Sequence, residues 1–141
     1  MNQFKLVVLL IAAMALCATT VAAPPKRVTA ELTPPPGSPC PDASGSVSAT
    51  YEGPLRWPRD NPWKEVKFYQ ATIGFFVQGL TPGVHYELYG WGPNSGPILV
   101  DRFSTGDGSY FTGIYIGTPD KFAAYAVFEY GTDVIVLSGS P

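Results

Sequence analysis

The chain has 141 residues, of which 45% are hydrophobic, and its 9 basic and 11 acidic side chains give a formal net charge of −2. The lysines and arginines are scattered, which excludes the concentrated basic surface of a nucleic-acid-binding protein and gives no attraction to an anionic membrane. His85 is the only histidine, so metal sites built from several histidines are excluded as well.

Catalytic motifs are missing from the sequence. It has no Gly-x-Ser-x-Gly elbow, no phosphate-binding glycine loop and no Cys-x-x-Cys pair. The aspartates stand beside turns, where they commonly bond to the local backbone, and do not have the spacing of a calcium-binding loop. We therefore expect a protein that is not an enzyme, with no catalytic residue, no cofactor and no metal site, and with His85 exposed on a strand.

Residues 1–22 have the layout of a secretory signal peptide. Lys5 precedes an uncharged apolar run, and small residues follow as far as Ala23. We expect cleavage after Ala22, a secreted or periplasmic location, and no stable membrane insertion of the mature chain. Loss of Lys5 leaves 8 basic against 11 acidic residues, which is a net charge of −3.

Cleavage also removes Cys17 and leaves Cys40 as the single cysteine, so the mature chain must fold without an internal disulfide. Cys40 stands between two prolines. Two interpretations of this residue remain open. It is either an inert thiol in an extended segment, or a thiol that forms an intermolecular disulfide or is modified.

Residues 23–44 are predicted to be a proline-rich linker or tail, and residues 45–141 to be the folded domain. Seven prolines lie within residues 23–45, and such a run favours extended polyproline II structure and buries little surface. On this interpretation the tail is dispensable for folding, and a chain that begins at Ser44 should keep its melting transition.

An irregular stretch, residues 53–63, follows the first predicted strand, residues 46–52. It contains three prolines and two tryptophans. Loops of this length inside a compact domain are often functional, and aromatic rings flanked by arginines suit stacking on sugars or peptides. Alternatively, the tryptophans cap an open end of the sandwich and the arginines stay solvated. The candidate ligand-binding residues of this stretch are Arg56, Trp57, Arg59 and Trp63.

The apolar residues change parity within residues 65–78. They are even-numbered at Val66 and odd-numbered from Ile73 to Val77. One unbroken strand cannot hold both sets on the same face, so we expect a bulge or break near residues 69–71.

Turn-forming residues divide the rest of the chain into short strands. Gly106-Asp107-Gly108 is predicted to join one pair as a hairpin, and Gly131-Thr132-Asp133 the last pair. The strand before this last turn is apolar on both faces and is therefore expected to be central in its sheet. A total of seven or eight strands without a helix favours an antiparallel β-sandwich over a small barrel. These later strands are residues 98–105, 110–116, 122–128 and 134–137.

Residues 71–91 hold two strands and the turn that joins them. The stretch Leu80-x-Pro82-Gly83-x-x-Tyr86 resembles the corner of fibronectin type III and related Ig-like sandwiches. The resemblance implies an antiparallel Ig-like β-sandwich, in which the chain crosses between two sheets and the tyrosine hydroxyl bonds to the backbone of the corner. A type III domain has about one strand after this tyrosine. In this chain 55 residues follow it.

Two classes of function fit these features. The first is a protein-interaction module of the cell surface or periplasm, in which a sandwich presents loops or a sheet face to a protein partner. The second is a carbohydrate-binding module that uses exposed aromatic residues. Tyr89 and Trp91 share the strand face opposite Tyr86, so the two rings can form a platform. The alternative for these rings is packing between the sheets or under the proline-rich tail. The expected partner is an unidentified protein or a glycan.

Overall fold

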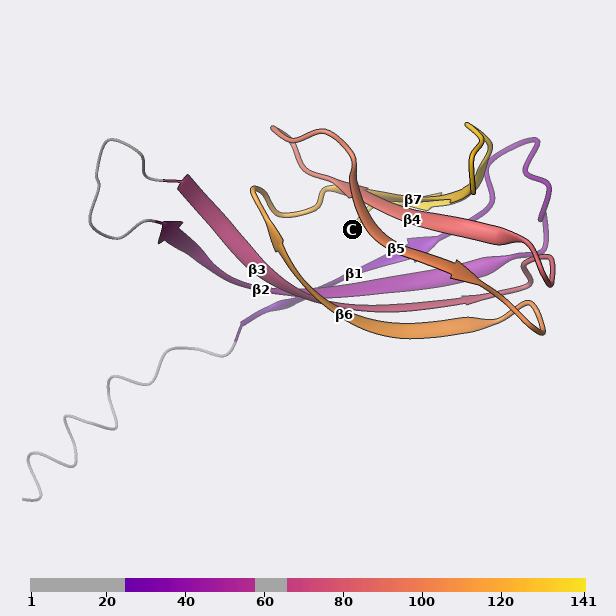
Figure 1. Cartoon of the computed structure of the whole chain (residues 1–141), viewed down its shortest axis with the longest axis horizontal. Helices are drawn as coiled ribbons and strands as arrows, with labels where there is room; N and C mark the ends of the chain where they lie inside the picture. The colour runs from indigo at the N-terminus through magenta and orange to yellow at the C-terminus, as the bar shows by residue number, and fades with distance from the viewer. Residues whose placement is uncertain (1–24, 58–65) are drawn as a thin grey trace, which may run out of the picture.

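The computed structural model describes residues 25–57 and 66–141, which form a two-layered β-sandwich (Figure 1). One antiparallel sheet has the strand order β1-β2-β3-β6 and the other has the order β5-β4-β7-β8. No helix is present in these residues, and the predicted all-β sandwich is confirmed. The eight strands are β1 (Arg27–Leu32), β2 (Ser44–Trp57), β3 (Val66–Gln78), β4 (His85–Trp91), β5 (Ile98–Ser104), β6 (Tyr110–Thr118), β7 (Ala124–Glu129) and β8 (Ile135–Gly139).

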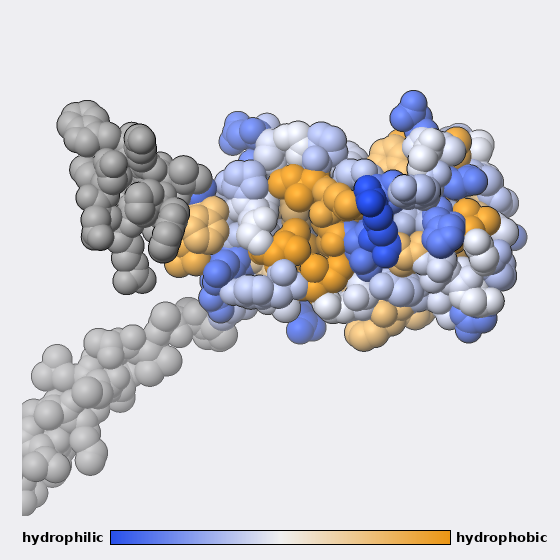
Figure 2. Space-filling model, in the orientation of Figure 1, coloured by the Kyte–Doolittle hydropathy of each residue, from blue (hydrophilic) through white to orange (hydrophobic). Residues whose placement is uncertain are grey.

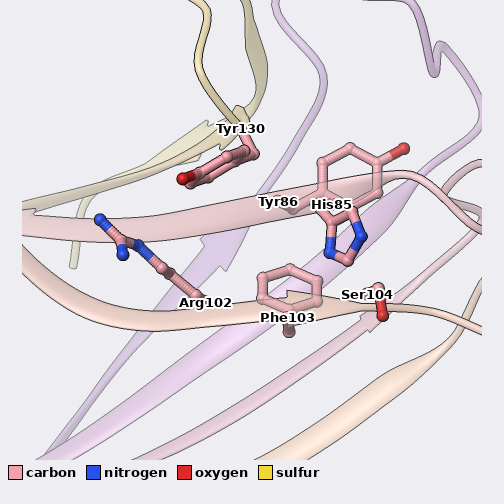
Figure 3. A pocket seen from close by; sticks show the side chains of 6 residues that line it. All are labelled: His85, Tyr86, Arg102, Phe103, Ser104 and Tyr130. Carbon is pink, nitrogen blue, oxygen red and sulfur yellow. The ribbon is translucent and has the colours of Figure 1, made fainter.

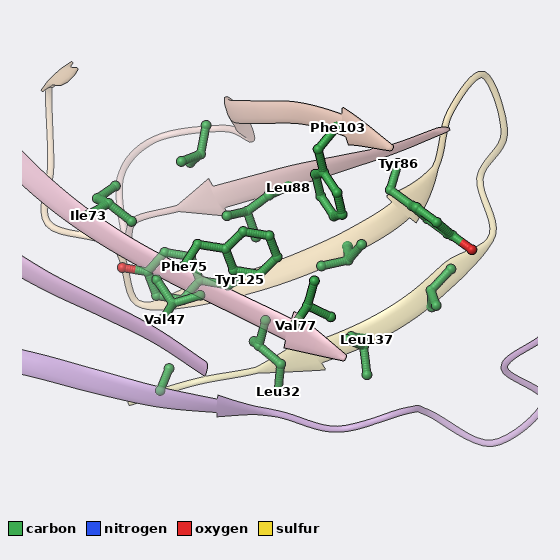
Figure 4. Close-up of a cluster of buried hydrophobic side chains, with 14 of the residues drawn as sticks. Leu32, Val47, Ile73, Phe75, Val77, Tyr86, Leu88, Phe103, Tyr125 and Leu137 are labelled. Carbon is green, nitrogen blue, oxygen red and sulfur yellow. The ribbon is translucent and has the colours of Figure 1, made fainter. Parts of the chain in front are cut away.

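The core lies between the two sheets (Figure 4). Ile73, Phe75 and Val77 of β3 are fully buried, which confirms the inward face predicted from their alternation. Leu88 of β4 and Val127 of β7 are fully buried in the opposite sheet. Burial of one such side chain stabilises a fold by about 1.5–3 kcal/mol, so the packing of the two inner faces accounts for a large part of the stability of the sandwich.

The turns of the second half of the chain connect strands in two different ways. The last predicted hairpin is confirmed, because β7 pairs with β8, and β7 is central as expected, between β4 and β8. The hairpin predicted at Gly106-Asp107-Gly108 is wrong, since β5 pairs with β4 and β6 pairs with β3. The crossing between sheets lets Phe103 and Tyr110 stack with ring centroids 4.6 Å apart. Turn residues therefore mark where the chain reverses, but not the sheet that the next strand joins.

The N-terminal segment belongs to the folded domain, which differs from the linker or tail expected for residues 23–44. β1 pairs along its whole length with β2. Its side chains alternate, with Ala30 and Leu32 buried in the core. Cys40 and Ala43, beyond the strand, are buried as well. The prolines of this segment lie outside β1, so they leave one short alternating run free to pair.

One side of the sandwich is closed by this segment. Thr33 and Ser138 exchange two backbone hydrogen bonds of 3.0 and 2.9 Å, which link the end of β1 to β8. Farther along, the Ser38 hydroxyl donates to the carbonyl oxygen of Val136 at 2.8 Å. On the opposite side, β5 and β6 are the border strands, and within the described residues they do not pair with each other. Among the described residues, the sandwich is therefore closed by backbone pairing at one side and lacks such pairing at the other, open side, where the Tyr110 hydroxyl donates a 2.9 Å hydrogen bond to Asp101.

The irregularity expected near residues 69–71 of β3 lies on the partner strand instead. β3 is continuous, and its register with β2 shifts between Glu52 and Leu55. Beyond this shift the ends of β2 and β3 project from the sandwich as a two-stranded arm (Figure 1). A strand must keep its apolar residues on one face only where a second sheet packs against that face. No second sheet covers the arm, so the apolar residues can change from odd to even positions there without a break in β3.

Candidate functional site

β4 places three candidate ligand-binding side chains on the outer face of its sheet. Tyr86 and Leu88 are buried and point into the core. Because successive side chains of a strand point to opposite faces, Glu87, Tyr89 and Trp91 lie on the outer face. The two aromatic residues are half-buried in that position.

β7 supplies the neighbours of these side chains. Phe128 lies directly opposite Glu87 in the antiparallel ladder. The next outward positions of β7 are Ala126 and Ala124, which lie opposite Tyr89 and the last residue of β4. Ala126 is fully buried in this position, so neighbouring side chains cover it, and Phe128 is the aromatic neighbour that β7 supplies.

Two adjoining depressions follow from this arrangement. One has a volume of about 430 Å³ and includes Glu87, Tyr89 and the turn 131–133 in its border. The other has a volume of about 310 Å³ and includes Trp91 in its border. Pro97 and Phe128 border both depressions, which therefore adjoin each other. We call the set Glu87, Tyr89, Trp91, Pro97 and Phe128 the aromatic groove.

The rings of the groove are fixed by contacts with one another. Tyr89 and Phe128 meet edge to face, with centroids 5.6 Å apart and an interplanar angle of 90°. This is a preferred geometry for an aromatic pair. The pair holds Tyr89 in place before any ligand arrives, and a rigid ring loses little conformational entropy on binding.

Glu87 brings a carboxylate to the floor of the groove. It is only 7% exposed, and its Oε2 accepts a 2.6 Å hydrogen bond from the Tyr89 hydroxyl. The bond raises the pKa of Tyr89, so the phenol stays a neutral donor. Arg102 Nε lies 3.6 Å from the same oxygen. Within the described residues no hydrogen bond reaches Glu87 Oε1, and since no buried polar atom there lacks a partner, this oxygen is open to solvent or to a ligand.

A further depression lies at the His85 end of β4 (Figure 3). Its volume is about 420 Å³. The Arg102 guanidinium lies 5.4 Å from the centre of the Tyr130 ring, and the His85 ring lies 6.5 Å from it. His85 is exposed. Because Arg102 contacts both Tyr130 and Glu87, it stands between this depression and the aromatic groove.

The ligand-binding residues proposed from the sequence fall into two groups. Tyr89 and Trp91 lie side by side with Phe128 in the aromatic groove. The four residues of the irregular stretch are not brought to it by any described contact. Arg56 and Trp57 belong to the end of β2, and their side chains are not among the described ones. Arg59 and Trp63 lie outside the described residues.

The corner residues lie between β3 and β4. Leu80 and Tyr86 are buried, and the Thr81 backbone N–H donates a 3.1 Å hydrogen bond to the Tyr86 hydroxyl. Pro82 and Gly83 are at the exposed tip, where Gly83 has a φ of 80°. That conformation is strained for any residue with a side chain.

Cys40 packs beneath this corner as a free, buried thiol. Its Sγ lies 3.9 Å from the Tyr86 hydroxyl and 3.6 Å from the Thr81 hydroxyl. Burial raises the pKa of Tyr86, so this hydroxyl remains neutral. In the folded chain the thiol is shielded from a partner, which favours the inert interpretation of this cysteine.

The sequence did not point to Glu87, Phe128, Pro97 or Arg102. The outward parity of Glu87 is visible in the alternation of β4, and could have marked it. The pairing of Phe128 with Glu87 and of Arg102 with Glu87 depends on the strand order. Short-range patterns carry no information on that order.

Fold and surface together define an all-β sandwich domain with an aromatic groove on the outer face of one sheet. Comparisons of the chain with protein-family models, with curated proteins and with solved structures gave no match. In residues 25–57 and 66–141, no three His, Cys, Asp or Glu side chains are grouped so that they could hold a metal ion. The same residues contain no helix with the length and apolar character needed to cross a bilayer.

Proposed function

We propose that the protein is an exported, secreted or periplasmic binding module without catalytic activity, and that its aromatic groove binds a glycan. Sugar rings have apolar faces that pack on aromatic rings, and hydroxyl groups that bond to carboxylates. Binding sites for small ligands are concave, mostly apolar and equipped with a few fixed polar groups. The aromatic groove has this composition.

The observation that carries the proposal is the position of the Glu87 carboxylate between aromatic rings. Tyr89 holds one carboxylate oxygen, and Glu87 borders the depression together with the Tyr89 and Phe128 rings. The depression around them, at about 430 Å³, lies within the usual range for ligand sites, which is about 300–1,000 Å³. Asp133 also borders it. Two carboxylates repel acidic sugars, so we expect neutral or amino sugars to bind in preference to uronates.

Screening of the mature chain on a glycan array is the first experiment. The array should contain neutral, amino and uronic acid sugars at equal density. The proposal expects neutral or amino glycans among the ligands, with affinities that calorimetry can then measure. A screen without a glycan ligand, repeated at high protein density, would contradict the proposal.

Trp91→Ala is expected to weaken glycan binding by about tenfold or more, as removal of a central aromatic contact costs more than about 1 kcal/mol. Its ring is half-buried, so the loss of stability should stay below the 3–5 kcal/mol, roughly, of a fully buried aromatic. Calorimetric titration and thermal melting measure the two effects. Phe76→Ala is the matched control, because this ring is 41% exposed on β3 of the other sheet. Equal affinity of Trp91→Ala and the parent would remove Trp91 from the site.

Glu87→Gln tests the carboxylate separately from the rings. Glutamine keeps the volume and can still accept the hydrogen bond from Tyr89. Hydrogen bonds to a charged group are stronger than neutral ones by about 1 kcal/mol, so we expect binding to weaken about fivefold. The melting temperature should change little, because Arg102 is largely exposed, with 60% of its side chain accessible. Unchanged affinity would mean that the ligand does not reach Glu87.

A protein-interaction module is the second candidate. The observation that favours it is the exposure of large apolar side chains on the outer face of sheet β1-β2-β3-β6. Phe111 is 75% exposed and Phe76 is 41% exposed, and the two lie opposite each other in the ladder. Exposed apolar patches of this kind mark interaction surfaces.

We also propose that the sandwich is Ig-like. The strand order supports this, because β2, β3 and β6 occupy the places of strands A, B and E, and β5, β4, β7 and β8 those of C′, C, F and G. β1 is then an additional strand. Tyr86 stands at the start of β4, whereas the corner tyrosine of an Ig-like domain stands at strand F. An experimental structure with other pairings would contradict the proposal.

A further inference from the structure

The border strand β6 differs from the other three sheet borders. Natural proteins protect a border strand with charges, prolines, bulges or short length, because its free backbone groups can pair with another chain. β6 pairs with β3 over nine residues without a register shift. Its sequence, Tyr-Phe-Thr-Gly-Ile-Tyr-Ile-Gly-Thr, contains no charge and no proline. Among the described residues, therefore, β6 carries none of these protections.

The other borders each carry at least one of them. β1 has only six residues and includes Arg27 and Glu31. β5 includes Asp101 and Arg102, and its register with β4 is broken by a shift. β8 has only five residues, and Ser138 on its free side is bridged by the N-terminal segment. The contrast within one molecule indicates that the border of β6 is left open for pairing.

The open side of the sandwich is apolar next to this strand. Ile98 of β5 and Ile114 and Ile116 of β6 are only partly buried against the core. Figure 2 shows apolar surface gathered in the middle of the visible face, where Figure 1 places β5 and β6. A strand that pairs with β6 would extend the sheet and cover this surface at the same time.

The sequence of β6 is self-complementary about Gly113. In an antiparallel pair of two copies centred on this glycine, Phe111 of one copy lies opposite Tyr115 of the other, and Thr112 lies opposite Ile114. Phe111 and Tyr115 are 75% and 62% exposed, on the same face. A side chain at Gly113 would meet no atom within 4 Å. Aromatic pairs directly opposite each other stabilise a sheet, and the two-fold axis would form the pair twice.

We propose that β6 pairs with β6 of a second copy of this chain, in the antiparallel register centred on Gly113. The dimer has two-fold symmetry, the commonest symmetry of protein oligomers, and joins two four-stranded sheets into one of eight strands. Since β6 carries no charge, the second copy brings no like-charge repulsion to the strand. The apolar surfaces at the open sides of the two copies then lie beside each other, and both are removed from contact with water.

Cross-linking tests the register. Gly113→Cys places two thiols opposite each other at the axis, whereas Gly117→Cys places them far apart along the strands. Both glycines have open space for a side chain and lack a positive φ, and the native Cys40 is buried. With residues 23–141 under mild oxidation, Gly113→Cys should form a covalent dimer in high yield and Gly117→Cys should form none. Equal yields, or a higher yield for Gly117→Cys, would overturn the register.

Charge substitutions test the pairing without cross-links. Phe111→Lys combined with Tyr115→Lys sets like charges opposite each other, and we expect dimer affinity to fall by about tenfold or more. Phe111→Lys combined with Tyr115→Glu sets opposite charges there and should restore the dimer. Tyr130→Lys is the control, because this ring is 53% exposed in the turn that follows β7, away from β6. Light scattering over a range of concentrations measures the mass. A parent that stays monomeric throughout, including one that pairs only with a strand of a different protein, would overturn the proposal.

Discussion

A chain that begins at Ser44 is expected to lose its cooperative melting transition. The deletion removes β1 with the fully buried Leu32, and also the buried Cys40 and Ala43. Truncation of one buried leucine to alanine costs about 2–5 kcal/mol, and a whole domain is stable by only about 5–15 kcal/mol. The stability lost with β1 and the buried residues after it is therefore comparable to the free energy of unfolding of the whole domain. Melting followed by circular dichroism, on chains starting at Ala23 and at Ser44, measures the effect.

The matched control for this deletion is a chain that begins at Lys26. It lacks the residues before β1 but keeps the whole strand, so it should melt like the mature parent. If the chain from Ser44 also melted like the parent, β1 would not contribute to the stable domain, and residues 23–44 would be the dispensable tail that their proline content suggests.

Tyr86→Ala is expected to be the most damaging single substitution at the corner. The ring is 2% exposed and lies against Phe103, with centroids 5.7 Å apart. Removal of a buried aromatic ring costs about 3–5 kcal/mol. Tyr86→Phe keeps the ring and removes the hydroxyl that accepts from the Thr81 N–H and contacts Cys40 Sγ, at a cost of about 1–3 kcal/mol. Midpoints of urea unfolding give both values.

Tyr130→Phe is the control for the hydroxyl, because Tyr130 is 53% exposed and changes at such sites usually stay within about 0.5 kcal/mol. The expected order of stability is parent and Tyr130→Phe together, then Tyr86→Phe, then Tyr86→Ala. Equal midpoints for Tyr86→Phe and the parent would mean that water replaces the hydroxyl, and that the hydrogen bond to Thr81 does not stabilise the corner.

Sequence alternation predicts the faces of single strands well in this protein. The inward positions of β3 and β4, such as Phe75 and Leu88, follow from the two-residue period alone. The pairing of strands does not follow from it. β3 pairs with β6, and β4 with β7, across about 40 residues in each case, and no turn signal reports a contact over that separation. For the same reason the turn signal after β5 predicts a hairpin that does not form.

β1 was missed for a different reason. Prolines dominate the composition around it, but none lies between Arg27 and Leu32, so the average over the segment hid six residues that can pair. The candidate site could likewise be predicted only in part from the sequence. The shared face of Tyr89 and Trp91 could be predicted from their spacing. The groove could not, because Phe128 joins them through the register of a strand that is distant in sequence.

The link between Thr33 and Ser138 affects the order in which the molecule can fold. It joins positions 105 residues apart, 138 minus 33, and contacts between residues so far apart in sequence form slowly, because a long loop must close first. If the chain is exported with its N-terminus leading, β1 arrives first, but its link to β8 must wait until the last strand has followed. In that case the closed side of the sandwich cannot form until β8 has crossed the membrane.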